Sequence, residues 1–146
     1  MPNPIYLDHN ATTPVAVEVA DAMSDALRKV YGNPSSSYSP GQTAATAIAG
    51  ARLALANLIG GDPEELIFTG CATEANNLAL LGVARAAADK RHLIISAVEH
   101  PAVMAPARYL ESQGWALTVI PVDEYGRVSA EAVANAVTPD THHAGE

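Results

Sequence analysis

A short run of small and polar residues, Gly70-Cys71-Ala72-Thr73-Glu74, stands between an apolar stretch and a segment with helical spacing. Where a strand leads directly into a helix, the first backbone N–H groups of the helix have no carbonyl partners within it. These groups and the positive end of the helix dipole can bind a phosphate or another anion, and the hydroxyl of Thr73 can add a hydrogen bond. The same residues are also typical of an ordinary capping turn, so both interpretations stay open.

A second candidate for chemistry is His100, which follows Glu99 and precedes Pro101. An imidazole ionises near neutral pH, so it can exchange protons with a bound ligand. The alternative is a histidine that caps a helix or is solvated in a loop.

The elements that position these residues follow from hydrophobic spacing and turn residues. The pattern predicts helices over 14–31, 42–58, 73–87, 101–113 and 130–137, and strands over 66–69, 92–97 and 115–120. Short apolar runs that alternate with helices predict an α/β fold, a three-layer arrangement in which helices cover a mostly parallel sheet. Ligands of such sheets bind at the carboxyl ends of the strands, and Thr73 and His100 follow two of the predicted strands.

Composition limits the classes of function. The 146 residues carry a net charge of −8, which argues against binding to nucleic acid or to an anionic membrane. The single cysteine excludes an internal disulfide, and no apolar stretch approaches the ~20 residues that cross a bilayer. The first residues lack the pattern of a signal peptide. We therefore expect a soluble cytoplasmic protein of one domain, or a piece of a larger one.

Four motifs occur in order along the chain. They are Tyr-Leu-Asp-His-Asn-Ala-Thr-Thr-Pro at 6–14, Gly-Asn-Pro-Ser-Ser at 32–36, Ala-Thr-Glu-Ala-Asn-Asn at 72–77 and Glu-His at 99–100. Together they resemble the N-terminal part of cysteine desulfurases, the pyridoxal-phosphate enzymes of the class-V aminotransferase group. The resemblance extends to about Thr141. It implies that residues 1–146 form one α/β unit, an incomplete cofactor-binding large domain of a fold-type I pyridoxal-phosphate enzyme.

The resemblance also implies a reaction and a set of site residues. The family converts L-cysteine to alanine and an enzyme persulfide, which supplies sulfur for iron–sulfur clusters through an acceptor or scaffold protein. Ala72 and Thr73 would hold the cofactor phosphate, and His100 would stack on the cofactor ring and transfer protons. The segment Asn10-Ala11-Thr12 would approach the substrate side of the cofactor, and its alternative is an Asx-type turn. The loop 33–41 would lie near a homodimer interface and the entrance to the site.

The chain also departs from the family pattern. Gly70-Cys71 stands where the family usually has Ser-Gly, and we expect Cys71 to be a small buried filler. Tyr38 stands where a histidine is common. The family's Schiff-base lysine, the acid that pairs with the pyridine nitrogen and the persulfide cysteine all lie beyond residue 146. We therefore expect Lys29 and Lys90 to be surface residues, with no covalent cofactor attachment at the family position.

These departures leave three interpretations. The chain is predicted to be part of a cysteine desulfurase that is inactive by itself, or a fragment of another class-V enzyme such as a selenocysteine lyase or an aminotransferase. The third is a non-catalytic, self-associating module that keeps the fold. We expect no metal site, because the adjacent His142 and His143 would point in different directions in a solvated tail.

Overall fold

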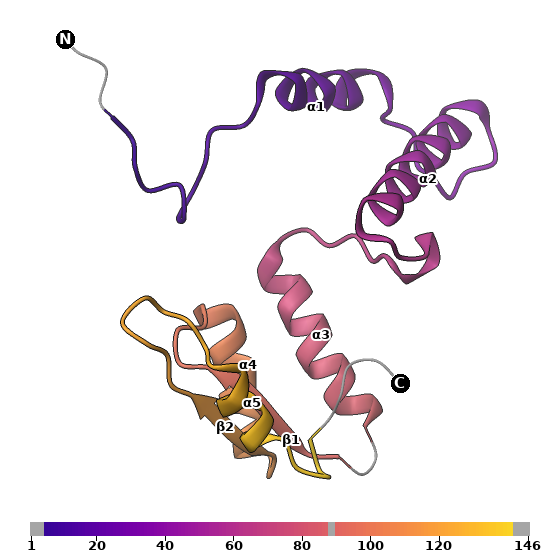
Figure 1. Cartoon of the computed structure of the whole chain (residues 1–146). Helices are drawn as coiled ribbons and strands as arrows, with labels where there is room; N and C mark the ends of the chain where they lie inside the picture. Colours follow the sequence, from indigo (N-terminus) through magenta and orange to yellow (C-terminus); the bar gives the residue numbers. More distant parts are fainter. Residues whose placement is uncertain (1–4, 88–89, 142–146) are drawn as a thin grey trace. The chain divides into compact units, whose positions relative to one another are not determined.

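The computed structural model describes residues 5–87 and 90–141. The chain forms two compact units, Met1–Ile67 and Phe68–Glu146 (Figure 1). The first is helical and contains α1 (Val17–Lys29), α2 (Ser39–Ile59) and the 3-10 turn η1 (Pro63–Glu65). The second contains α3 (Ala72–Ala86), β1 (His92–Ser96), α4 (Pro101–Ser112), β2 (Ala116–Ile120) and α5 (Ala130–Ala136).

Both long helices of the first unit begin away from their predicted starts. The predicted start of α1 at Pro14 is wrong, because the helix begins at Val17 and has no side-chain cap at Ala16. No residue of α1 is buried, so packing adds nothing that would extend it over the β-branched Val15. Helix α2 starts before the predicted Gln42, because Pro40 fits the first turn of a helix.

Gly41 at the start of α2 is packed against backbone. A Cβ atom added there would lie 2.6 Å from the carbonyl oxygen of Asn33 and would also meet that of Ser36. We therefore expect Gly41→Ala to destabilise the first unit by roughly 1–3 kcal/mol, the scale of overpacking. Gly50→Ala is the matched control, because that α2 position faces open space and should gain about 0.5–1 kcal/mol. Amide exchange across α2 measures both, and equal protection in the two variants would contradict the prediction.

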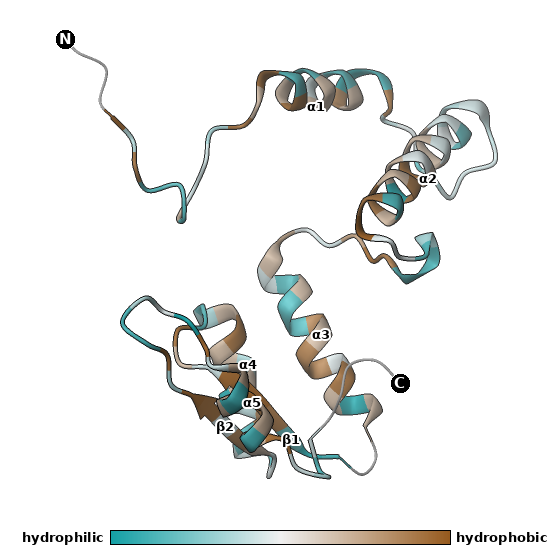
Figure 2. Ribbon diagram, viewed as in Figure 1, coloured by the Kyte–Doolittle hydropathy of each residue, from teal (hydrophilic) through white to brown (hydrophobic). Residues whose placement is uncertain are grey.

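The second unit has an α/β fold with a parallel sheet flanked by helices. Strands β1 and β2 pair in parallel, in a register that runs from His92 opposite Ala116 to Ser96 opposite Ile120. Figure 2 shows hydrophobic residues along β2. Helix α4 packs on β2 and on α3, and α5 also contacts β2. The prediction of an α/β fold with a parallel sheet is confirmed.

The predicted strand at 66–69 is wrong in this structure. Leu66 has an extended backbone, with φ −87° and ψ 127°, but its carbonyl accepts a hydrogen bond from the Arg52 guanidinium instead of a neighbouring strand. A strand forms only where another strand supplies hydrogen-bond partners. Among residues 5–87 and 90–141 the sheet consists of β1 and β2, so the three predicted strands become two.

The core of the second unit is aliphatic, with one tryptophan. Its buried apolar side chains are Ile95, Ala102, Ala107, Leu110, Trp115 and Ile120. Ala107 on α4 is 0% exposed, and a small side chain at such a position lets a helix approach its neighbours closely. This packing fixes the start of α4, where one of the candidate site residues lies.

A buried histidine connects the amino ends of the strands to the segment before residue 142. His92 Nδ1 lies 2.7 Å from the hydroxyl of Thr141, and Nε2 lies 2.8 Å from the hydroxyl of Thr118. The backbone N–H of His92 also donates to the backbone carbonyl of Asp140 at 3.1 Å. The imidazole is 5% exposed, and both ring nitrogens have partners, as burial of a polar ring requires. The sequence interpretation had treated His92 only as the first residue of a strand.

Residues 123–127 form a turn, and its stability should depend on pH. The Arg127 backbone N–H lowers the pKa of Asp123 below its ordinary 3.8, helped by the Arg127 side chain and the Tyr125 N–H against partial desolvation. A carboxyl with a lowered pKa stabilises the folded turn above 3.8, and that stabilisation is lost as the pH falls through the folded-state pKa. We expect the Arg127 amide to lose exchange protection in that acid range. In Asp123→Asn, protection of the Arg127 amide should not vary with pH over the same acid range. An equal acid response in the variant and the unchanged chain would show that Asp123 does not cause the pH dependence.

No helix in the described part of the chain is both long enough and apolar enough to span a membrane.

Candidate functional site

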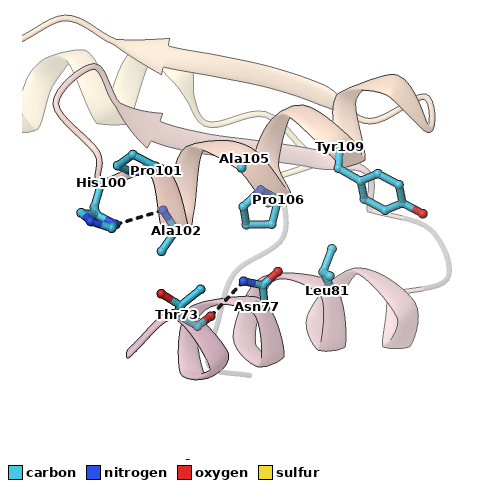
Figure 3. A pocket seen from close by; sticks show the side chains of 9 residues that line it. All are labelled: Thr73, Asn77, Leu81, His100, Pro101, Ala102, Ala105, Pro106 and Tyr109. Atoms are coloured by element: carbon cyan, nitrogen blue, oxygen red, sulfur yellow. Dashed lines mark hydrogen bonds between the residues drawn. The ribbon is translucent and has the colours of Figure 1, made fainter. Parts of the chain in front are cut away.

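A groove lies between α3 and α4 of the second unit, with a volume of about 490 Å³ (Figure 3). Thr73, Asn77 and Leu81 line it from α3, at successive turns of that helix. His100 and Tyr109 lie on the α4 side. The structure therefore brings two of the predicted site residues, Thr73 and His100, to one groove.

The start of α3 is arranged to leave backbone N–H groups open to a ligand. Cys71 is the N-cap residue, with φ −165° and ψ 167°, and its side chain makes no cap hydrogen bond. The predicted phosphate residues Ala72 and Thr73 are the first two of the helix, where N–H groups lack intrahelical carbonyl partners. Glu74 instead turns back and accepts the Gly70 N–H at 2.7 Å. The helix dipole, these amides and the Thr73 hydroxyl together suit an anion.

Asn77 belongs to the motif at 72–77, but the sequence interpretation gave it no role in the site. Its side-chain amide donates to the carbonyl of Thr73 at 2.9 Å, one helical turn away, and it lines the groove. The spacing of four residues from Thr73 was the available signal, because residues at i and i+4 share a helix face.

His100 is the N-cap residue of α4. Its Nδ1 accepts the backbone N–H of Ala102 at 3.0 Å, so the capping role that the sequence left open is confirmed. Because Nδ1 accepts, the proton of the neutral ring lies on Nε2. The ring also lines the groove, which leaves Nε2 as the nitrogen that can meet a ligand as a donor.

The residues Asn10, Ala11 and Thr12 belong to the first unit. The N–H groups of Ala11 and Thr12 both donate to the carbonyl of Asp8, at 3.1 and 3.3 Å. The hydroxyl of Tyr6 lies 2.7 Å from that of Thr12. The segment is thus an exposed turn closed by a backbone carbonyl, rather than by an asparagine side chain as an Asx-type turn would be. Its predicted approach to the substrate stays a prediction.

Two further expectations concern a loop and a thiol. The loop at 33–41 is only partly a loop, since Asn33 closes a turn by accepting the Ser35 N–H at 2.9 Å and α2 begins at Ser39.

The expectation that Cys71 is a buried filler is wrong, because Cys71 is exposed. Among the residues that the structure describes, the sheet consists of β1 and β2, so the extended segment before Cys71 is not one of its strands.

The two lysines differ in their surroundings. Lys29 is an exposed residue of α1 that pairs with Asp25 at 2.8 Å. Lys90 is partly buried and precedes the amino end of β1, whereas His100 follows its carboxyl end. A five-residue strand separates these ends by about 13 Å. Neither lysine lines the groove, so covalent attachment of an aldehyde cofactor there needs a lysine from another part of a protein.

Within residues 5–87 and 90–141, no three His, Cys, Asp or Glu side chains come together as a metal site would require. His142 and His143, which the sequence interpretation placed in a solvated tail, lie outside the described residues.

The chain is similar to known proteins in both sequence and fold. The cysteine desulfurase IscS of Methanosarcina thermophila is 44% identical over 138 residues, which are 94% of this chain and 34% of that relative. The selenocysteine lyase of Xenopus tropicalis is 42% identical over 156 aligned residues, covering 97% of this chain and 36% of the lyase. A solved NifS-like protein superposes with a TM-score of 0.86 at 38% identity, over 94% of this chain and 38% of its own.

The chain thus spans about a third of the length of the relatives that it matches. The sequence profile of class-V aminotransferases matches residues 5–144, almost the whole chain. The motifs at 6–14, 32–36, 72–77 and 99–100 all fall within this match. The chain belongs to the aminotransferase class-V family.

Proposed function

We propose that residues 1–146 are the N-terminal portion of a cysteine desulfurase, and that the groove between α3 and α4 holds pyridoxal phosphate. The observation that carries the proposal is that Thr73, at the start of α3, and His100, at the start of α4, line one groove. The identity of 44% to a cysteine desulfurase supports L-cysteine as the substrate and alanine and an enzyme persulfide as the products.

The residues of the groove fit this cofactor in kind. The N–H groups of Ala72 and Thr73 and the Thr73 hydroxyl would bind the phosphate, helped by the dipole of α3. His100 would lie against the ring, with its Nε2–H available as a donor. Asn77 holds the first turn of α3 through the Thr73 carbonyl, and so orients the phosphate donors. When bound, pyridoxal phosphate supplies the electron sink that carbon–sulfur cleavage in an amino acid needs.

The residues present supply binding and one candidate proton carrier, but not covalent anchorage. The groove contains no lysine among its described lining residues, and the family's lysine and persulfide cysteine have no counterpart within 1–146. We therefore expect this chain alone to bind the cofactor reversibly without desulfurating cysteine. Residues 1–146 would be an incomplete large domain that works in a longer or complemented protein.

The proposal extends to the location, oligomeric state and partners of the completed enzyme. We place the completed enzyme in the cytoplasm as a homodimer that passes sulfur to an acceptor or scaffold protein for iron–sulfur cluster assembly. Exposed apolar side chains on the first unit, such as Leu7, Met23 and Leu27 at 84%, 58% and 79% exposure, support an assembly that covers them. The net charge of −8 argues against nucleic acid as a partner.

A selenocysteine lyase is the second candidate, because a selenocysteine lyase is 42% identical to this chain. Both reactions remove a chalcogen from an amino acid and leave alanine, so the groove residues do not separate them. Competition between L-cysteine and L-selenocysteine in the completed enzyme would separate them, and turnover of selenocysteine alone would select the second candidate.

The test compares two proteins, residues 1–146 alone and the same residues joined to the rest of the Methanosarcina thermophila relative. Alanine released from L-cysteine is measured after loading with pyridoxal phosphate. We expect release only from the joined chain, and less of it at limiting cofactor when Thr73 is changed to alanine, because that change weakens cofactor binding. Alanine release by residues 1–146 alone would overturn the account of the missing lysine. A folded joined chain with bound cofactor and no activity on cysteine or selenocysteine would overturn the function.

A further inference from the structure

We propose that Ser96 and Glu99 are positioning residues for His100. A hydrogen bond between their side chains spans the short connection from β1 to α4. Together with the N-cap bond of α4, this bond holds the His100 ring at the groove as the Nε2–H tautomer. The inference rests on the proposed function only in giving the imidazole a ligand to meet. The hydrogen bonds that hold the ring are formed by the chain itself and can be tested without cofactor.

The connection is fixed by hydrogen bonds at each step. The Ala97 N–H donates to the Ile120 carbonyl at 2.9 Å, which extends the pairing of β1 with β2 by one residue. The Ser96 hydroxyl donates to Glu99 Oε1 at 2.8 Å, and both side chains are partly buried. His100 Nδ1 then accepts the Ala102 N–H. The four residues between strand and helix are thus tied to the sheet, to each other and to α4.

Apolar packing does not hold this connection. Val98 at its centre is 59% exposed, and Ala97 and His100 are exposed as well. A connection without buried side chains keeps one conformation only through its hydrogen bonds. The Ser96–Glu99 bond is the side-chain bond that spans the connection, so its loss should free the backbone on the N-terminal side of His100.

The Glu99 carboxylate also interacts favourably with the dipole of α4. Glu99 comes one residue before the N-cap of α4, where the helix dipole favours a negative charge. The bond to Ser96 directs that carboxylate toward the end of β1. Glu99 therefore stabilises the start of α4 without taking the Ala102 N–H, which is left to the imidazole.

The tautomer follows from the cap. The Ala102 N–H is a donor, so Nδ1 must offer its lone pair, and a proton on Nδ1 would set two donors against each other. While the cap is intact the neutral ring carries its proton on Nε2. If the connection loosens, the cap breaks for part of the time and the other tautomer becomes accessible. Glu99 and Ser96 thus act on the ring through the connection, without touching it.

The experiment compares Ser96→Ala and Glu99→Ala with the conservative variants Ser96→Thr and Glu99→Gln, all in the 146-residue chain without cofactor. Glu111→Ala is the control, because it removes a carboxylate from the other end of α4, where it pairs with the exposed Arg108. The readouts are hydrogen exchange at the Ala102 amide and the ring ¹⁵N spectrum of His100. We expect the two alanine variants to exchange about five- to tenfold faster at Ala102, the scale of one lost hydrogen bond. Their ¹⁵N spectra should move toward mixed tautomers.

Ser96→Thr and Glu111→Ala should match the unchanged chain in both readouts, and Glu99→Gln should stay closer to it than Glu99→Ala, because glutamine loses only the charge. Unchanged exchange and tautomer in both alanine variants would overturn the inference, as would a Glu99→Gln spectrum as disturbed as that of Glu99→Ala, because glutamine keeps the acceptor oxygen. If one alanine variant fails to fold, the other decides the question. A titration of the unchanged chain with pyridoxal phosphate tests the proposed function separately, so the two failures are distinguishable.

Discussion

Changing Thr73 to alanine is expected to weaken the binding of pyridoxal phosphate by about five- to 150-fold. This range corresponds to about 1–3 kcal/mol, the value of a hydrogen bond to a charged group. The hydroxyl stands on the second residue of α3, at a helix start without a side-chain cap, so no neighbouring side chain replaces it there. Isothermal titration or the absorbance of the bound cofactor measures the dissociation constant.

Two variants make the result specific. Thr73→Ser keeps the hydroxyl and should restore most of the affinity. Thr43→Ala removes a threonine hydroxyl from α2, where it donates to the carbonyl of Ser39 at 3.0 Å, and should leave the affinity unchanged. Equal affinity in Thr73→Ala and the unchanged chain would mean that the start of α3 does not hold the phosphate.

The second large effect is on stability, because Trp115→Ala should lower the free energy of unfolding of the second unit by roughly 3–5 kcal/mol. Trp115 is 8% exposed, directly precedes β2, and lines a small cavity with Leu81 of α3 and Leu110 of α4. Its removal leaves a void beside residues of both helices that form the groove. Urea unfolding followed by far-ultraviolet circular dichroism measures the loss, and the cofactor affinity should fall with it.

Tyr125→Ala is the aromatic control for this prediction. Tyr125 is 73% exposed in the turn after β2, where its ring lies 5.0 Å from the Arg127 guanidinium carbon. We expect its loss to cost less than about 1 kcal/mol, as for an exposed cation–π pair. A similar loss of stability in both variants would show that Trp115 is not part of a packed core.

Local sequence signals predicted most of the second unit. Pro101 at a helix start, Gly114 after a helix and Ser129 as an N-cap place α4 and α5 within one or two residues, because caps and turns depend on neighbouring residues. The run at 92–97 became β1 because β2 pairs with it. The run at 66–69 has the same apolar character but is not part of the sheet in the described part of the chain. Sequence alone cannot reveal whether a distant strand pairs with such a run.

The candidate site was predictable in part for the same reason. Thr73 and His100 follow from the residue types at two strand-to-helix junctions, and the structure brings both to one groove. The role of Asn77 and the Ser96–Glu99 bond were missed, since they depend on which way side chains turn. The exposure of Cys71 was misjudged, because burial of a residue at a helix start depends on which distant elements pack over it.

The most direct test of the central claim is a pyridoxal-phosphate titration of the 146-residue chain, followed by amide chemical shifts and then by borohydride reduction. We expect saturable shifts at Ala72, Thr73 and His100, with no lysine adduct trapped. An absence of shifts at these residues would contradict the phosphate site and favour a non-catalytic module. A trapped adduct on Lys29 or Lys90 would contradict the conclusion that neither lysine lines the cofactor site.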